Sequence, residues 1–292
     1  MTDESSFDWK SISILLCTPV RGGFSPSYKR SARALEAWCH SQDIPFDTCD
    51  VAEAPVDKAR DLLAAAYLAA THGGQPYSHC LMIDSGVGFG IETVRRLVAA
   101  GEDFTAAAVP LRQSNITKTA DLGEARWAAT FAVQFPRETR ETGKVRLVNK
   151  GGSMFASIDM IGAAMLCLRR DVLLRIYDAY PELAHKDGFR YFVPGLFDED
   201  GMSHVGRLKR ALDRAKSTPD SDIRDQLITD ALAFDPKDFA DCGEDVSFCK
   251  RWLGVPHDDE DHSRPEIWML TDAPLMHEGH GFFAGNFSDT FD

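Results

Sequence analysis

Four consecutive apolar residues, Cys80–Ile83, run without a polar break and end at Asp84. Such a run is typical of a strand that is covered on both faces, as in a parallel sheet. Ser85 and Gly86 follow, with further glycines, so the chain can turn sharply there and approach a ligand closely. Because an open α/β sheet binds its ligands beyond the carboxyl ends of its strands, Asp84 lies where chemistry is expected. Asp84 could instead only cap the helix that begins near Ile91.

Strand and helix patterns alternate along the first 110 residues. Alternation at this spacing predicts an α/β fold in which a mixed, mainly parallel sheet is flanked by helices. The predicted strands are Ser11–Val20, Phe46–Val51, Cys80–Ile83 and Phe104–Pro110, and the predicted helices are Ser27–Gln42, Val56–Thr71 and Glu92–Ala100.

The second part of the chain has a less regular pattern. Residues 204–235 read as a polar helical insertion, within which His204–Ala215 is basic. Elsewhere the patterns predict strands at Trp127–Phe135, Val145–Val148, Ser157–Leu168 and Glu266–Leu270, and helices at Arg169–Tyr180 and Cys242–Leu253.

Composition narrows the classes of function. The formal net charge of −13, with no basic tract, disfavours non-specific binding to nucleic acids or anionic membranes. Seven scattered cysteines without a C-x-x-C spacing, a polar N-terminus and the absence of a long apolar run predict a cytoplasmic protein. Neither G-x-G-x-x-G at the first helix nor a P-loop motif is present, which disfavours a dinucleotide-dependent oxidoreductase and a P-loop enzyme.

Polar residues that could carry chemistry lie at the ends of predicted elements. Asp84 and His277 could together hold Mn²⁺ or Mg²⁺ while a ligand's phosphates complete the coordination, because hard cations prefer oxygen ligands and Mn²⁺ accepts imidazole. His277 could equally be a polar surface residue in a glycine-rich segment. Glu244 and Asp245 open a helix, where acids complement the helix dipole, or one of them could be a general base.

Two arginines are candidates for neutralising a diphosphate. Arg21 follows the first strand, and Arg60 lies near the start of a predicted helix. One guanidinium group can bind two phosphate oxygens at once. An exposed arginine, however, often contributes only to solubility.

Several motifs in order resemble those of bacterial and phage glycosyltransferases of the GT-A fold. They are T-P-x-x-G-G after the first strand, V-D-K-A-R-D-L-L on a helix, H-C-L-M-I-D-S-G-V-G-F, then S-I-D-M-I-G-A-A-M-L-C-L, G-E-D-V-S-F-C-K-R-W and L-M-H-E-G-H-G-F-F. The resemblance implies a single GT-A-like domain over residues 1–292. Residues 11–110 would form its nucleotide-sugar-binding half and residues 111–292 its acceptor-side half.

The resemblance also implies roles for individual residues. Asp84 would be the first carboxylate of the Asp-x-Asp metal motif and His277 a late metal ligand. Asp245, or less favourably Glu244, would be the base of an inverting transfer, and Ala163 would border the sugar. The expected donor-binding residues are Thr18, Pro19, Arg21, Arg60, Asp84, Ser85, Gly86 and Ala163.

One position departs from the family pattern. Gly86 stands where the second Asp of the motif is expected, so one oxygen ligand is lost. Either Asp84 and His277 hold Mn²⁺ or Mg²⁺ with water in the gap, or the enzyme works with little or no metal. The expected donor is a nucleotide sugar, and the acceptor stays open between a glycan, a small molecule and modified DNA.

Two alternative functions remain. One is a phage-type enzyme that glycosylates a hydroxymethylated base in DNA, with the basic stretch His204–Ala215 lying along the phosphate backbone. The negative net charge of the chain disfavours this alternative. The other is a non-catalytic nucleotide-sugar-binding module, which is suggested by Gly86 in place of the second Asp of the metal motif.

Overall fold

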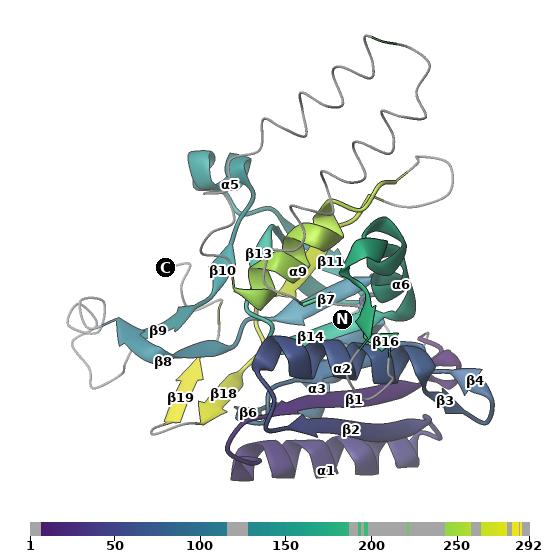
Figure 1. Cartoon of the computed structure of the whole chain (residues 1–292). Helices are drawn as coiled ribbons and strands as arrows, with labels where there is room; N and C mark the ends of the chain where they lie inside the picture. Colours follow the sequence, from purple (N-terminus) through teal and green to yellow (C-terminus); the bar gives the residue numbers. More distant parts are fainter. Residues whose placement is uncertain are drawn as a thin grey trace.

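An eight-stranded mixed sheet forms the centre of the computed structural model, with helices on both faces (Figure 1). The structure describes residues 7–115, 128–186, 192–193, 196–197, 221, 243–257, 264–278, 282–285 and 287. The sheet has the order β11-β12-β17-β7-β14-β5-β1-β2. Its strands are β1 (Ile14–Val20), β2 (Phe46–Ala52), β5 (His79–Ile83), β7 (Phe104–Ala107), β11 (Leu147–Lys150), β12 (Ser153–Ile158), β14 (Met165–Arg169) and β17 (Ile267–Leu270).

The direction of the strands confirms the predicted fold class. Strands β12 and β14 run antiparallel to their neighbours, and the other strands of this sheet all run in one direction. The result is a mixed, mainly parallel α/β sheet, consistent with a GT-A-like fold. The described helices are α1 (Pro26–Ser41), α2 (Val56–Ala69), α3 (Ile91–Ala99), α5 (Arg137–Thr142), α6 (Arg170–Ala179) and α9 (Glu244–Leu253).

Short elements complete the described chain. Two 3₁₀ helices are η2 (Trp9–Ser11) and η3 (Pro181–Leu183). The short strands are β3 (Thr71–His72), β4 (Gln75–Pro76), β6 (Val87–Gly88), β8 (Pro110–Asn115), β9 (Ala128–Phe131), β10 (Val133–Gln134), β13 (Met160–Ile161), β15 (His185–Lys186), β16 (Phe192–Val193), β18 (Leu275–Glu278) and β19 (Phe282–Gly285).

Helices cover both faces of the sheet, and successive strand residues point to opposite faces, so each strand contributes side chains to two cores. In β1, Leu15 and Cys17 pack into the core under α2, α6 and α9, whereas Ile14 and Leu16 pack into the core under α1 and α3. All four side chains are buried. When both faces of a strand are buried, apolar side chains are favoured at every position, which explains the continuous apolar runs in the sequence.

The strands and helices predicted for the first 110 residues are all present, with ends shifted by no more than three residues. The prediction of one strand over Ser157–Leu168 is wrong. The chain leaves the central sheet after Ile158, pairs with β10 through β13, and returns to the sheet only at Met165. The N–H of Gly162 bonds to the carbonyl of Ala132 at 2.8 Å, so residues near Gly162 cross between two sheets.

A three-stranded sheet, β19-β18-β6, brings the end of the chain to the turn after β5. His277 of β18 lies opposite Val87 of β6, and the N–H of Glu278 bonds to the carbonyl of Gly86 at 2.8 Å. A Cβ at Gly88 would lie 2.8 Å from the Cβ of Ser27, so glycine allows β6 to lie against α1.

The predicted polar insertion at 204–235, with its basic stretch His204–Ala215, lies outside the residues that the structure describes, apart from the single position 221. The division of the chain into a donor half and an acceptor half stays a prediction. Among the helices of the described residues, none has the length and apolar character that crossing a bilayer requires.

Gly151 provides a test of the packing between the turn β11–β12 and α3. Its φ is +56°, and an added Cβ would overlap the carbonyl oxygen of Ala99 and lie 2.7 Å from the carbonyl carbon. We expect Gly151→Ala to lower the free energy of unfolding by about 2–4 kcal/mol, from left-handed strain plus overpacking.

Gly143 is the matched control, because its φ is +67° but an added Cβ would have no neighbour within 4 Å. Gly143→Ala should cost only the strain, about 1–2 kcal/mol. Urea unfolding of both variants measures the difference. Equal losses would show that the contact with Ala99 has no energetic consequence.

Candidate functional site

A pocket of about 560 Å³ opens at the carboxyl ends of β1 and β5. Its lining comes from the end of β1, the first turns of α2, the turn after β5, the crossing segment before β14, the start of α9, and β18. The pocket is lined by nearly all the predicted site residues, namely Pro19, Arg21, Arg60, Asp84, Ser85, Gly86, Ala163, Glu244, Asp245 and His277.

Asp84 directly follows β5, and its backbone is held on both sides. Its N–H bonds to the carbonyl of Ala164 at 3.0 Å, and its carbonyl accepts from the N–H of Val87 at 3.0 Å. The side chain is 29% exposed and faces the pocket. The alternative in which Asp84 caps the following helix is wrong, because α3 has Gly90 as its N-cap and no side-chain capping bond.

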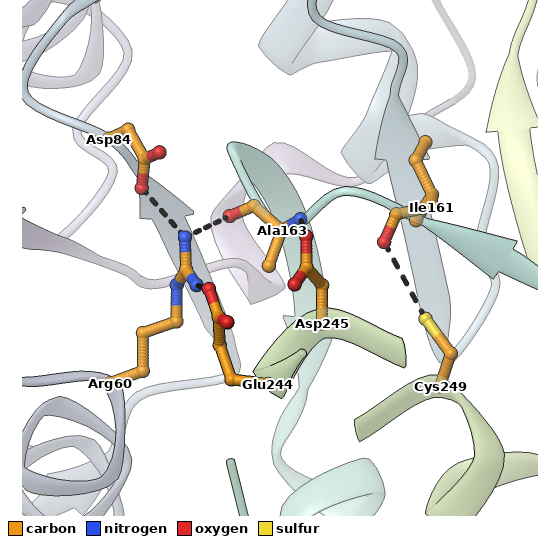
Figure 2. A network of polar contacts seen from close by, with 7 residues as sticks. All are labelled: Arg60, Asp84, Ile161, Ala163, Glu244, Asp245 and Cys249. Carbon is orange, nitrogen blue, oxygen red and sulfur yellow. Dashed lines mark hydrogen bonds and ion pairs between the residues drawn. The ribbon is translucent and has the colours of Figure 1, made fainter. Parts of the chain in front are cut away.

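Arg60 of α2 lies at the centre of a polar network (Figure 2). Its Nη2 donates to Oδ1 of Asp84 at 3.0 Å and to the carbonyl of Ala163 at 3.4 Å, and its Nη1 donates to Oε1 of Glu244 at 2.5 Å. Only 3% of the residue is exposed. Burial alone would lower the pKa of this guanidinium, but Asp84, Glu244 and Asp245 outweigh burial and raise the pKa.

The two acids at the start of α9 have different surroundings. Glu244 pairs with Arg60, and burial followed by the charge of Asp245 raises the pKa of Glu244 against the opposing effect of Arg60. Asp245 accepts a hydrogen bond at Oδ2 from the N–H of Ala163 at 3.3 Å. The N-cap of the helix is Gly243, which offers no side chain, so both carboxylates complement the N-terminal end of the helix dipole as well.

The start of α9 is anchored to the crossing segment before β14. The thiol of Cys249 donates to the carbonyl of Ile161 at 3.7 Å, one helical turn beyond Asp245 (Figure 2). Gly162 lies between the two anchoring residues of this segment, Ile161 and Ala163. A Cβ there would contact Oδ2 of Asp245 at 3.5 Å. The segment 161–163, which interrupts the predicted strand Ser157–Leu168, therefore forms the part of the pocket that orients Asp245.

His277 reaches the pocket from β18. Its Nδ1 donates to the carbonyl of Pro110 at 2.9 Å, since a carbonyl can only accept. In the neutral ring the lone pair then lies on Nε2, an arrangement typical of imidazoles that bind metals. The interpretation of His277 as an ordinary surface residue is not supported, because it lines the same pocket as Asp84.

The donor set for a metal ion is incomplete on the protein side. Among the described residues, no group of three His, Cys, Asp or Glu side chains could hold an ion. Asp84 and His277, the two predicted metal ligands, both line the pocket.

Thr18 is the predicted donor-binding residue that does not line the pocket. Only 1% of it is exposed, and its hydroxyl is bonded to the hydroxyl of Tyr28 in the core under α1. The pocket also has apolar walls that the sequence analysis did not identify. They include Val20, Val56, Val109, Leu111, Ala132 and Ile161, and apolar residues at strand ends carry no signal that separates lining from core.

Comparisons with known proteins find weak structural similarity and no match in sequence. No protein-family model matches the sequence, and no curated protein matches it. Among solved structures, A197 from STIV is similar over 95% of this chain and 91% of its own, with 11% identity and a TM-score of 0.42. A glycosyltransferase involved in the glycosylation of the major capsid of PBCV-1 is similar over 56% of this chain and 62% of its own, with 10% identity and a TM-score of 0.26. Similarities this weak give no information about the chemistry of the pocket.

Proposed function

We propose that this protein is a glycosyltransferase that moves a sugar from a nucleotide sugar to an acceptor hydroxyl, with inversion at the anomeric carbon. The observation that carries the proposal is the convergence of Arg60, Asp84, Asp245 and His277 on one pocket at the carboxyl ends of parallel strands. These residues lie far apart in the sequence, and each matches a residue that the resemblance to GT-A glycosyltransferases implies.

The proposed reaction is a single displacement. Asp245 accepts the proton of the acceptor hydroxyl, whose oxygen attacks the anomeric carbon as the bond from that carbon to the phosphate oxygen breaks. The N–H of Ala163 fixes the orientation of the Asp245 carboxylate. Negative charge grows on the departing diphosphate, so a cation beside it stabilises the transition state more than the ground state.

The charges of the pocket favour a divalent cation as a partner of the donor. Among the described residues, its lining carries the carboxylates of Asp84, Glu244 and Asp245 but only two guanidinium groups, those of Arg21 and Arg60. A diphosphate adds further negative charge, which would be repelled by this lining. Asp84 and His277 would hold Mn²⁺ or Mg²⁺ there, and the ion would supply charge stabilisation at the diphosphate.

A thermal-shift panel of nucleotide sugars, with and without Mn²⁺, tests the proposal. Binding to the native state stabilises it by about 2.7 kcal/mol when the ligand is at 100 times its Kd, so one donor class should raise the Tm clearly. We expect the increase to be larger with Mn²⁺, and we expect Asp84→Asn to abolish that Mn²⁺-dependent part.

Sugar transfer, or hydrolysis of the donor that binds, is then measured with the same protein. Binding without either reaction would indicate a non-catalytic nucleotide-sugar-binding module. The absence of binding across the panel would refute the proposed function.

A further inference from the structure

The two arginines of the pocket differ in what their guanidinium groups contact. We propose that Arg60 is a positioning residue that acts through Asp84 and Glu244, and that Arg21 is the cation that binds the phosphates of the donor. This inference rests on the function proposed above. It departs from what the family resemblance implies, in which Arg60 binds the donor directly.

The guanidinium of Arg60 already forms hydrogen bonds within the protein. Its two terminal nitrogens donate to Glu244 and to Asp84, and one of them also reaches the carbonyl of Ala163. Its Nε is buried and has no hydrogen-bond partner in the described structure, so a ligand could not reach it without movement of the chain. With 3% of the residue exposed, Arg60 has little surface to offer a diphosphate.

Arg21 is in the opposite situation. It lines the same pocket, is exposed, and forms no ion pair with any residue that the structure describes. It follows β1 directly and precedes Gly22 and Gly23, whose φ angles are +73° and +98°. An exposed guanidinium that lines the pocket can bind phosphate oxygens without first breaking an internal pair.

The contacts of Arg60 join three parts of the chain that build the site. They are α2, the turn after β5 and the start of α9, and the partners lie 24 and 184 residues away in the sequence. Without this cation, Asp84, Glu244 and Asp245 would face each other in a partly buried setting. Like charges in such a setting repel each other and move apart. This movement would displace Asp245 from the N–H of Ala163 and misplace the base.

Arg60→Lys tests this role, because one ammonium cannot reproduce the forked contacts of a guanidinium. We expect turnover at saturating donor to fall roughly 10²-fold, the cost of a misplaced catalytic group. Measured without Mn²⁺, the Kd of the nucleoside diphosphate that binds best to the unmodified protein should change by less than about 3-fold, since Arg60 does not touch the ligand. Arg21→Gln should raise that Kd by about 10-fold or more, through loss of a charge-assisted contact.

Two further variants separate positioning from general damage. Arg137→Lys is the matched control, because Arg137 is an exposed arginine of α5 whose side chain is 85% exposed, and it should behave as the unmodified protein. The double variant Arg60→Met with Glu244→Gln removes both charges of the pair. If Arg60 acts through Glu244, the double variant should recover part of the turnover that Arg60→Met alone loses.

The outcomes distinguish this inference from the proposed function. A loss of nucleotide affinity in Arg60→Lys, with turnover at saturation unchanged, would make Arg60 a donor ligand and overturn the inference. If the double variant recovers nothing, Arg60 does not act through Glu244, and that part of the inference is overturned. If the unmodified protein neither binds a nucleoside diphosphate nor transfers sugar, the proposed function fails, and the assignment of Arg21 and Arg60 fails with it.

Discussion

Replacing Asp245 by asparagine should lower the rate of sugar transfer by about 10²–10⁴-fold, the usual effect of removing a general base. Asparagine has the same shape, and its carbonyl oxygen can still accept the hydrogen bond from the N–H of Ala163. The start of α9 should therefore keep its place. What is lost is the capacity to take a proton from the acceptor.

Steady-state kinetics and nucleotide binding, measured on the same preparation, check this prediction. The Kd of the donor should stay close to its original value, because Asp245 belongs to the acceptor reaction in this mechanism. Glu244→Gln is the informative comparison, since it removes the adjacent acid and leaves the buried guanidinium of Arg60 with one carboxylate partner fewer. Unchanged turnover in Asp245→Asn would exclude Asp245 as the base.

Replacing Trp252 by alanine should lower the free energy of unfolding by about 3–5 kcal/mol. Trp252 lies near the end of α9, and only 1% of it is exposed. Its indole N–H donates to the carbonyl of Glu266 at 2.8 Å, and the guanidinium of Arg175 lies 4.9 Å from the ring centroid. Truncation leaves a large cavity under the helix that carries Glu244 and Asp245.

Urea denaturation measures this loss, and Trp252→Phe provides the control. Phenylalanine keeps an aromatic ring in the core but loses the hydrogen bond to Glu266, so it should cost less than the alanine variant, roughly 1–2 kcal/mol. A loss below about 1 kcal/mol in Trp252→Ala would mean that the packing of α9 does not depend on this side chain.

Local patterns were sufficient to predict the first half of the fold. A buried strand shows as an apolar run and a covered helix shows as a repeat near 3.6 residues, and both depend only on neighbouring residues. Asp84 could be placed at a ligand-binding edge for the same reason, because the end of an apolar run and the glycines after it are local features.

The strand predicted over Ser157–Leu168 shows where local patterns fail. Its composition suits a single strand, yet β13 pairs with β10 rather than with the central sheet. That choice depends on a bond between Gly162 and Ala132, residues from two different segments. The same limit applies to Thr18, whose hydroxyl bonds to Tyr28 in the core although its position in the sequence suits a pocket.

Local chemistry and spacing were enough to predict the α/β class and half of the described residues that line the pocket, because both follow from neighbouring residues. That the guanidinium of Arg60 pairs with Asp84 and Glu244, while the exposed Arg21 in the same pocket has no such pair among the described residues, follows from the three-dimensional arrangement alone. The reason is physical: a guanidinium pairs with whichever carboxylate the fold brings within hydrogen-bond distance. In this chain one of those carboxylates is 184 residues away.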